Sequence, residues 1–335
     1  MIASQGSTQT KKATSDIVGV DFATTGTKMV RIKRGKQGYV IFGLEELPTF
    51  DSLGDRLDLP KALRSKNLAL AATSCSSVVR LLNLPGFSEQ AEGAQNTVRE
   101  HIGGEEGFRV SYEVAVPTSR GRSEARVLAV ALPEEDAQGV LDKLSSSSVA
   151  PLSMEVSALA AMSGFSHGPL LRHGKETVAF IEGGASVTCI GIFTNGALSL
   201  FRKFDFGTNT LISRVQRQLG VDEETANDIV RNNSFDITQI TKEVLAPVMR
   251  QISISREFVE RKGAGPIQRW YLSGGLATTH YWKEQVAQSV GGIAHAWNPF
   301  ESFEIAPSVD VDRWAGQEVR FAAAVGAAVG ALEES

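Results

Sequence analysis

Apolar residues form short runs separated by turn residues, and one such arrangement occurs twice in the chain. Near the N-terminus, an apolar run ends at Asp21, passes through small and hydroxyl residues, and resumes as a strand that turns at Gly35. Mid-chain, a second run ends at Glu182, and the strand that follows it turns at Gly196. Asp21 and Glu182 are as far apart as Gly35 and Gly196, 161 positions in each case. The repeat therefore predicts two related halves, each beginning with a strand, a tight turn and a hairpin.

The rest of the apolar pattern alternates between strand and helix spacing. Ser88 and one of the two threonines, Thr278 or Thr279, are predicted to begin helices, and Pro247 is predicted to kink or break one. Alternating elements of this kind indicate an α/β fold, in which ligands bind at the carboxyl ends of the strands. Further strands are expected at 67–73, 78–84, 108–116, 125–132 and 267–272, and helices at 88–102, 134–145, 152–163, 211–219, 222–231, 236–262 and 316–332.

Changes in the pattern of apolar runs and turn residues along the chain predict its domains. Turn residues bound a compact α+β insert, and the segments on either side of it belong to one domain. The predicted organisation is a disordered tail at 1–15, a first domain at 16–76, 150–172 and 316–335, an inserted subdomain at 77–149, and a second domain at 173–315.

Composition narrows the class of protein. The 335 residues are 42% hydrophobic and 21% charged, with a net charge of −4, which is ordinary for a soluble protein and argues against a general nucleic-acid binder. The two cysteines, Cys75 and Cys189, lie in apolar stretches and are expected to be buried thiols. No apolar run approaches the length of a membrane span, and residues 1–15 lack the core of a signal peptide, so we expect a cytoplasmic protein.

The two turns have the chemistry of phosphate sites. Small residues allow backbone N–H groups to approach a polyphosphate, and carboxylates such as Asp21 and Glu182 often hold Mg²⁺ through water. Lys28 can neutralise phosphate charge, and Gly274 with Gly275 before a helix would admit an adenosine or a phosphate. Each feature also has a plain structural interpretation, because strand-end carboxylates and glycine pairs commonly form turns, and a lysine commonly faces solvent.

Several motifs resemble those of one family. Residues 18–28, 181–186 and 272–276 resemble the two phosphate motifs and the adenosine motif of actin-like ATPases, in the form found in the PilM family. Residues 80–85 and 127–133 resemble the extra subdomain that PilM shares with the division protein FtsA. The remaining matches are 152–158, which resembles the helix crossing between the halves, 207–211, 298–300 and 322–330. The resemblance extends over about residues 16–332.

This resemblance implies an actin-like fold, with two related RNase H-like halves around a nucleotide cleft and an FtsA/PilM-type insert. It implies ATP and Mg²⁺ as cofactors, with Glu155 and Glu182 as candidate catalytic residues and with Asp21 and Glu182 holding the metal through water. The implied cofactor-binding residues are Asp21, Thr24, Thr25, Thr27, Lys28, Gly184, Ser186, Thr188, Gly207, Asn209, Gly274, Gly275, Leu276 and Gly326.

The chain departs from the family where nucleotide chemistry is least tolerant. Ala23 replaces a glycine in the first turn, and Glu182 replaces the usual aspartate in the second. Thr208 stands where the family tends to have glycine, and Val230 falls near a position that is often lysine. These departures predict weak binding of ATP and negligible hydrolysis.

The resemblance implies a scaffold on the cytoplasmic face of the inner membrane, in a type IV pilus or a type II secretion machine. Its expected partner is the cytoplasmic tail of a PilN-like membrane protein, bound beside residues 77–149, and self-association is left open. The alternatives are an active ATPase or sugar-kinase relative and an FtsA-like filament protein. The end of the chain lacks the basic amphipathic helix of FtsA-like proteins, and we find no acid/base constellation of a sugar kinase.

Overall fold

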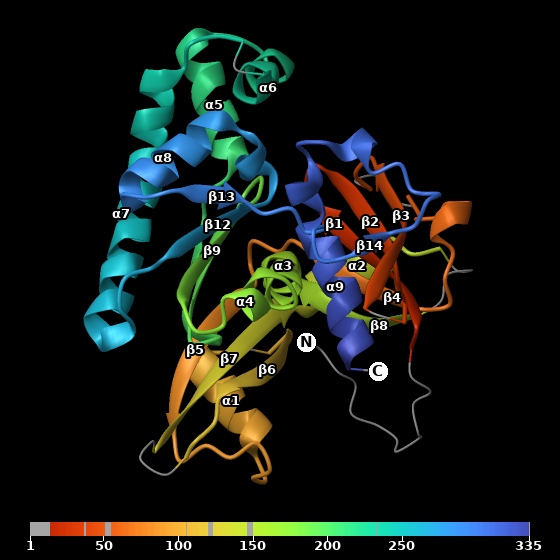
Figure 1. Cartoon of the computed structure of the whole chain (residues 1–335), viewed down its shortest axis with the longest axis vertical. Coiled ribbons are helices and arrows are strands. Elements are labelled where there is room, and N and C mark those ends of the chain that lie inside the picture. Colours follow the sequence, from red (N-terminus) through yellow and green to blue (C-terminus); the bar gives the residue numbers. More distant parts are fainter. Residues whose placement is uncertain are drawn as a thin grey trace. The chain divides into compact units, whose positions relative to one another are not determined.

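The computed structural model describes residues 14–36, 38–50, 55–104, 106–119, 123–145, 150–232 and 234–334. The chain forms two compact units (Figure 1). Of the predicted tail, only Thr14 and Ser15 lie within the described residues. Unit 1 comprises Met1–Gly168, Pro299–Ala315 and Phe321–Ser335, and unit 2 comprises Pro169–Asn298 and Gly316–Arg320.

Unit 1 is built on a six-stranded sheet with the order β14-β3-β2-β1-β4-β8. The first three strands form an antiparallel meander, while β4 and β8 run parallel to β1, and β14 runs parallel to β3. The strands are β1 (Asp16–Ala23), β2 (Gly26–Arg34), β3 (Tyr39–Leu47), β4 (Leu68–Ala72), β8 (Pro151–Val156) and β14 (Glu304–Ile305).

Unit 2 repeats this arrangement in a five-stranded sheet with the order β11-β10-β9-β12-β13. Each strand has the same neighbours and directions as its counterpart in unit 1. Both hairpins carry a register shift at equivalent positions, between Arg31 and Ile32 and between Ile192 and Phe193. The predicted duplication is therefore confirmed. The strands are β9 (Thr177–Gly183), β10 (Thr188–Thr194), β11 (Ala197–Phe204), β12 (Arg269–Ser273) and β13 (Ala294–Ala296).

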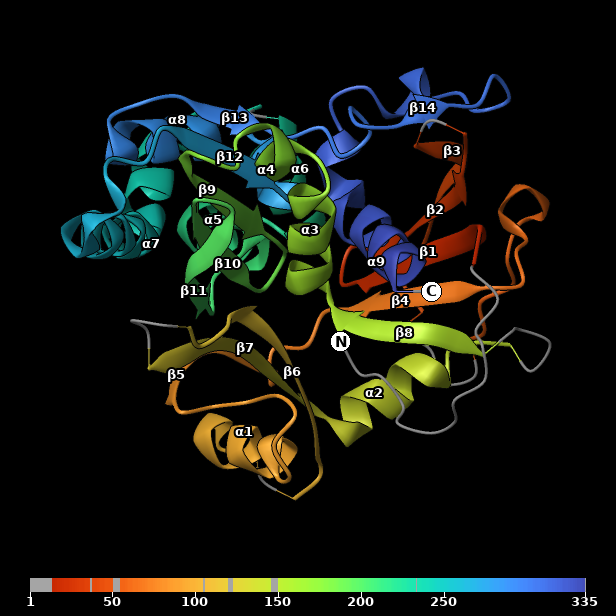
Figure 2. The same cartoon turned by 60° about the horizontal axis from the view of Figure 1, so that its bottom comes forward.

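Both faces of the sheet in unit 1 are covered by helices (Figure 2). Helix α9 (Ala322–Glu333) lies on β1, and α3 (Ser157–Ser166) packs against α9. A Cβ on Gly19 would stand 2.0 Å from the carbonyl oxygen of Ala324, so only glycine allows α9 to approach β1 this closely. The opposite face carries a core of Val18, Val20 and Leu70, covered by α2 (Glu134–Leu141) and the short helix η1 (Lys61–Leu63).

The predicted insert contains a three-stranded antiparallel sheet with the order β5-β7-β6, built from β5 (Val78–Pro85), β6 (Phe108–Val116) and β7 (Glu124–Pro133). Helix α1 (Ala94–Ile102) packs on it through Val98 and Ile102. The prediction that Ser88 begins this helix is wrong. The left-handed Gly93 precedes the first helical residue, and Ser88 lies in a turn before it.

Helices flank the sheet of unit 2 (Figure 1). Of the predicted kink or break at Pro247, the break does not occur, because α7 continues through this residue. Its buried residues on either side, Leu245 and Val248, hold the helix in the core and offset the hydrogen bond that proline cannot make. Thr279 is the residue before α8, as predicted. The helices are α4 (Pro169–Arg172), α5 (Thr208–Leu219), α6 (Glu223–Asn232), α7 (Thr238–Val259), η2 (Glu260–Ala264), η3 (Gly275–Thr278) and α8 (His280–Val290).

Three further expectations need correction. Residues 152–156 form strand β8 rather than a helix, because Met154 and Val156 alternate with Ser153 and Glu155 and the segment pairs with β4. The last helix starts at Ala322, after the short helix η5 (Glu318–Phe321), rather than near residue 316. Cys75 is exposed in the loop after β4, whereas Cys189 is buried as expected.

Residues 299–315 pack within unit 1, although the sequence placed them in the second domain. This segment contains the short helix η4 (Asp312–Trp314), and aromatic side chains hold it in unit 1. The rings of Phe300 and Trp314 contact Phe321 at centroid distances of 5.6 and 4.7 Å, and β14 extends the sheet beside β3. None of the helices in the described residues is both long and apolar enough to cross a membrane.

Candidate functional site

Charged residues form a row across the sheet of unit 1. Strand register places Glu46 of β3 opposite Lys28 of β2, and Lys28 opposite Asp21 of β1. In the other direction, Asp21 aligns with Ala71 of β4, and Ala71 aligns with Glu155 of β8. Aligned residues of neighbouring strands share a face, so one row of the sheet carries three carboxylates and an ammonium group.

Asp21 belongs to a buried hydrogen-bonded chain. Its side chain is only 4% exposed, and its Oδ1 accepts a hydrogen bond of 2.7 Å from Oγ of Ser157, the first residue of α3. Ser157 in turn accepts a bond of 3.3 Å from Oγ1 of Thr73. Burial raises the pKa of Asp21, while the hydroxyl of Ser157 and the charge of Lys28 oppose that shift. The carboxyl group is thus held inside the unit.

Lys28 is committed to partners within the chain. It is 2% exposed, and its Nζ lies 3.6 Å from Oε1 of Glu46. The same Nζ donates to the carbonyl oxygen of Gly26 at 3.1 Å and to Oγ1 of Thr25 at 3.3 Å. Three acceptors match the three hydrogens of an ammonium group. A phosphate would therefore have to compete with Glu46 for this charge.

The remaining predicted residues of the first turn divide by exposure. Thr24 and Thr25 are exposed in the turn between β1 and β2, whereas Thr27 is buried. Gly26 has a φ of 128°, and a Cβ there would stand 2.9 Å from Oε1 of Glu46. Glycine at this position thus lets Glu46 reach Lys28.

Glu155 lies beneath α9, away from the turn. Its Oε1 is 3.2 Å from the position that a Cβ on Gly330 would take. Burial, together with the carboxylates of Glu334 and Glu113, raises the pKa of Glu155 to about 7. Gly326, one helical turn earlier, faces α3, where a Cβ would stand 1.6 Å from the carbonyl oxygen of Ala160. Close packing therefore explains glycine at position 326.

Replacing Ser157 by alanine should destabilise the protein by about 2 kcal/mol, because the buried carboxyl group of Asp21 would lose its donor. The free energy of unfolding in urea measures this loss. Ser153→Ala is the matched control, since Ser153 is also buried and its Oγ has no partner among the described residues. Equal losses in the two variants would contradict the assigned bond.

In unit 2, the second turn is closed by its own backbone. The N–H group of Gly184 donates to the carbonyl oxygen of Val187 at 2.9 Å. The first N–H groups of α5 bind the same turn, Thr208 to the oxygen of Gly184 at 3.1 Å and Asn209 to that of Ala185 at 2.9 Å. These N–H groups are the usual anion donors of a helix N-terminus, and here they are already bonded.

Side chains complete this packing. A Cβ on Gly207 would stand 2.3 Å from the carbonyl group of Ala185, so glycine allows α5 to meet the turn. Asn209 is exposed and donates to Oγ of Ser186 at 3.3 Å. Thr188 is buried, and its hydroxyl donates to the carbonyl oxygen of Phe206. Thr188 therefore ties β10 to the chain before α5 rather than facing solvent.

The loop after β12 lies against Glu182. Gly274 has a φ of 79°, and a Cβ there would stand 2.6 Å from Oε1 of Glu182. The N–H group of Gly274 donates to the carbonyl oxygen of Val319 at 3.2 Å, so this donor is also used. Gly275 begins η3, while Leu276 is fully buried beneath Gly183. The longer side chain of glutamate thus brings a carboxylate against the turn expected to receive adenosine.

The predicted residues divide between the two units, and in unit 1 Glu155 and Gly326 lie apart from the turn. Sequence reasoning missed Thr73, Ser157 and Glu46 in unit 1, and Val319 in unit 2. Hairpin pairing would have placed Glu46 opposite Lys28, but no sequence signal linked the other three to the site. Among the described residues, no group of three or more histidine, cysteine, aspartate or glutamate side chains could hold a metal ion. The unit 1 set is Asp21, Thr24, Thr25, Thr27, Lys28, Glu155 and Gly326, and the unit 2 set is Glu182, Gly184, Ser186, Thr188, Gly207, Asn209, Gly274, Gly275 and Leu276.

Solved structures with similar folds include the PilM–PilN type IV pilus biogenesis complex, at 17% identity and a TM-score of 0.76, over 96% of this chain and 99% of the other. MreB 5 of Spiroplasma citri bound to AMPPNP is 11% identical, with a TM-score of 0.45 over 94% and 95%. The archaeal actin homologue Ta0583 in complex with ADP is 13% identical, with a TM-score of 0.46 over 95% and 99%.

The fold is thus the actin-like ATPase fold, as the sequence predicted. The family model described as type IV pilus assembly protein PilM matches residues 105–331, about two-thirds of the 335 residues. The chain belongs to the PilM family of type IV pilus assembly proteins.

Proposed function

We propose that the chain is a scaffold of the inner-membrane platform of a type IV pilus or type II secretion machine, acting at the cytoplasmic face of the membrane. Its partner is the short cytoplasmic tail of a PilN-like membrane protein. One observation carries this proposal. The fold matches that of the PilM–PilN complex over 96% of this chain, including the insert. The family match begins within the insert, at residue 105.

The partner's tail is proposed to bind beside residues 77–149. Strand β8 leads out of this insert and is the edge strand of the sheet in unit 1. An edge strand offers unpaired backbone groups to an extended peptide, and its outward side chains give selectivity. Leu152 on this strand is 48% exposed, so its apolar side chain is accessible to a peptide that pairs with this edge.

A peptide-binding experiment tests this proposal. The ligands are fluorescent peptides from the cytoplasmic tails of single-span membrane proteins encoded beside this gene, and anisotropy reports their binding. One peptide should bind with micromolar affinity, and Leu152→Asp should weaken it at least about tenfold, since a charged residue would disrupt an apolar contact. Leu171→Asp is the control, because Leu171 is 74% exposed in unit 2. If none of the peptides binds, or if both variants bind equally well, the proposal fails.

We further propose that nucleotide is bound weakly or not at all, and that this chain derives no catalytic step from it. Glu46 already neutralises Lys28, and the N–H groups of Thr208, Asn209 and Gly274 are bonded within the chain. A bound ATP and Mg²⁺ would have to displace these bonds. Titration calorimetry with Mg·ATP, together with a phosphate-release assay, tests this proposal. Sub-micromolar affinity with steady turnover would instead favour an active ATPase.

A further inference from the structure

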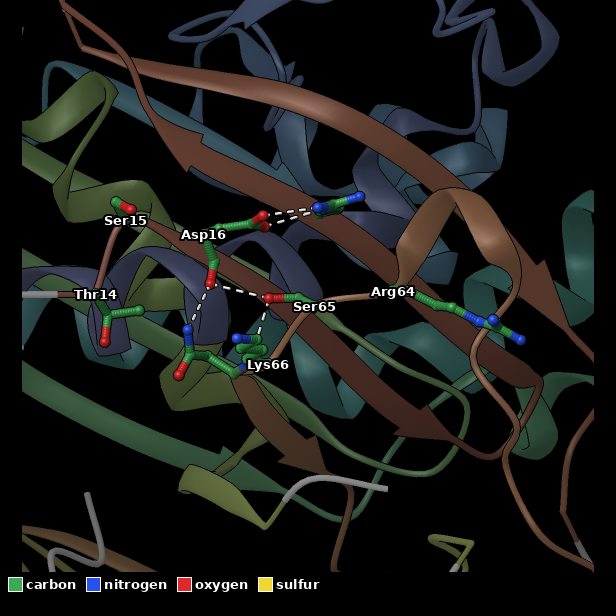
Figure 3. A pocket seen from close by; sticks show the side chains of 8 residues that line it. Thr14, Ser15, Asp16, Arg64, Ser65 and Lys66 are labelled. Carbon is green, nitrogen blue, oxygen red and sulfur yellow. Dashed lines mark hydrogen bonds and ion pairs between the residues drawn. The ribbon is translucent and has the colours of Figure 1, made fainter. Parts of the chain in front are cut away.

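A polar pocket opens at the end of unit 1 where β1 begins. It encloses about 680 Å³, which lies within the range of small-molecule sites. Figure 3 shows Asp16 at its centre, with Ser65, Lys66 and Arg64 on one side and Thr14 and Ser15 on the other. None of its residues comes from the insert or from the row that contains Asp21 and Lys28, so this pocket is a separate feature of the unit.

Hydrogen bonds fix the wall of the pocket. Asp16 accepts from Arg31 through both oxygens, Nε to Oδ1 at 2.9 Å and Nη2 to Oδ2 at 2.6 Å, and Nζ of Lys33 lies 3.4 Å from Oδ2. The carbonyl oxygen of Asp16 accepts from Oγ of Ser65 at 3.0 Å and from Nδ2 of Asn67 at 2.8 Å (Figure 3). The segment that carries Arg64 and Lys66 is therefore tied to the first strand of the sheet.

Arg64 and Lys66 supply charge that the chain does not use. Both are exposed, and neither forms an ion pair with any described residue. They belong to two stretches in contact, 31–36 and 61–66, since Nη1 of Arg31 donates to the carbonyl oxygen of Ala62 at 3.3 Å. These stretches contain seven basic residues and no acidic one, in a chain with a net charge of −4.

The acidic groups at this end of the sheet do not cancel that charge. Asp16 is shared between Arg31 and Lys33, and Glu333 accepts a hydrogen bond from the hydroxyl of Tyr39. The carboxylate of Glu304 also belongs to this region, since its strand pairs with β3 at Val40. The ion pairs of Asp16 are with Arg31 and Lys33, and they do not include Arg64 or Lys66, which line the pocket.

Aromatic rings lie among the basic side chains of this end. Nζ of Lys33 lies 4.5 Å from the ring centroid of Phe42, and the guanidinium group of Arg34 lies 5.5 Å from that of Tyr39. Phe42 is 37% exposed. Basic groups combined with exposed aromatic rings are typical of surfaces that meet phospholipid headgroups, where phosphates pair with the cations and rings enter the interface.

We propose that this pocket binds the phosphate of an anionic phospholipid headgroup, so that the end of the sheet formed by the stretches 31–36 and 61–66 docks directly on a negatively charged membrane. The guanidinium group of Arg64 and the ammonium group of Lys66 bind the phosphate oxygens, and the surrounding cations face neighbouring headgroups. An acidic peptide would supply the same charge, but it would not call for the exposed ring of Phe42 beside Lys33. This contact is independent of the proposed PilN-like partner, so either can fail alone.

Vesicle flotation tests the proposal. The full chain should float with vesicles of phosphatidylcholine containing 30% phosphatidylglycerol (on the order of cell-membrane charge) and not with pure phosphatidylcholine. Binding should weaken as salt rises, because exposed charges are screened. Arg64→Glu/Lys66→Glu should reduce the partition coefficient at least about tenfold, since each basic residue near an anionic surface contributes a factor of about five. Thermal unfolding checks that the variant is folded.

Lys242→Glu/Arg250→Glu is the matched control. It makes the same change in net charge at two exposed residues of α7, in unit 2, that form no ion pair with any described residue. The control should float like the wild-type chain. The proposal is overturned if the wild-type chain does not float with anionic vesicles, or if both double variants lose binding equally. It is also overturned if only inorganic phosphate or poly-glutamate binds at Arg64 and Lys66, which would assign the pocket to a soluble anion or an acidic protein segment.

Discussion

Glu155→Gln should stabilise the protein by about 3 kcal/mol at pH 8 and leave its stability nearly unchanged at pH 4.5. Burial raises the pKa of Glu155 from 4.5 to about 7 in the folded chain. Between these values, the unfolded chain releases a proton that the folded chain retains, so wild-type stability falls as pH rises through this window and levels off above about 7. A shift of this size corresponds to about 3 kcal/mol. Glutamine does not titrate, so the variant avoids the loss.

Urea unfolding at pH 4.5, 6 and 8 measures this difference. The curves of the wild-type chain and the variant should diverge progressively between the first and the last pH. Glu135→Gln, on the exposed surface of α2, is the control and should follow the wild-type curve. The prediction fails if the stabilities of Glu155→Gln and the wild-type chain depend on pH in the same way, or if the variant is less stable at pH 8. Either result would indicate that an ionised Glu155 stabilises the fold.

Gly326→Ala should destabilise the protein by about 3 kcal/mol or prevent folding. The added methyl group would stand 1.6 Å from the carbonyl oxygen of Ala160 and 2.9 Å from the backbone nitrogen of Gly164, both in α3. These are backbone atoms, so no side-chain rotation can relieve the overlap, and the two helices would have to move apart. Thermal and urea unfolding would record the loss.

Gly139→Ala is its matched control. Gly139 is an exposed helical glycine of α2, and a Cβ there would meet nothing within 4 Å. Alanine favours a helix over glycine at both positions, so this variant should gain about 0.5–1 kcal/mol. Opposite signs for the two substitutions are the expected outcome. If Gly326→Ala left the free energy of unfolding unchanged, α3 and α9 would not pack this closely. Such a result would favour the nucleotide-binding role predicted for Gly326.

Much of the fold could be predicted from the sequence because its signals are local. The two hairpins repeat at a constant offset along the chain, so Asp21 and Glu182 were placed correctly near the ends of equivalent strands. The strands of the insert likewise followed from apolar runs between turns. The segment around Glu155 was mistaken for a helix because six residues of strand run directly into α3, and a short strand leaves little periodicity to detect.

The candidate site was less predictable. The sequence shows which polar residues the site contains. Whether each can bind a ligand depends on the residue that it contacts in the folded chain. Lys28 faces Glu46, and Asp21 faces Ser157, which follows it by 136 positions. The N–H group of Gly274 likewise bonds to Val319, 45 positions later in the chain. Such contacts join segments distant in sequence, and no local pattern encodes them.

By itself, the sequence determined the duplicated α/β architecture, the three strands between residues 78 and 133, and the family. These follow from the spacing of apolar residues, the turn residues and the order of the motifs. Such features persist at low sequence identity, because each is set by short stretches of the chain. Only the tertiary structure decided which polar groups are free. Packing buries Lys28 against Glu46 and leaves Arg64 and Lys66 exposed, although all three look alike in the sequence. Burial and ion pairing are properties of the folded chain, because they depend on which distant atoms displace water.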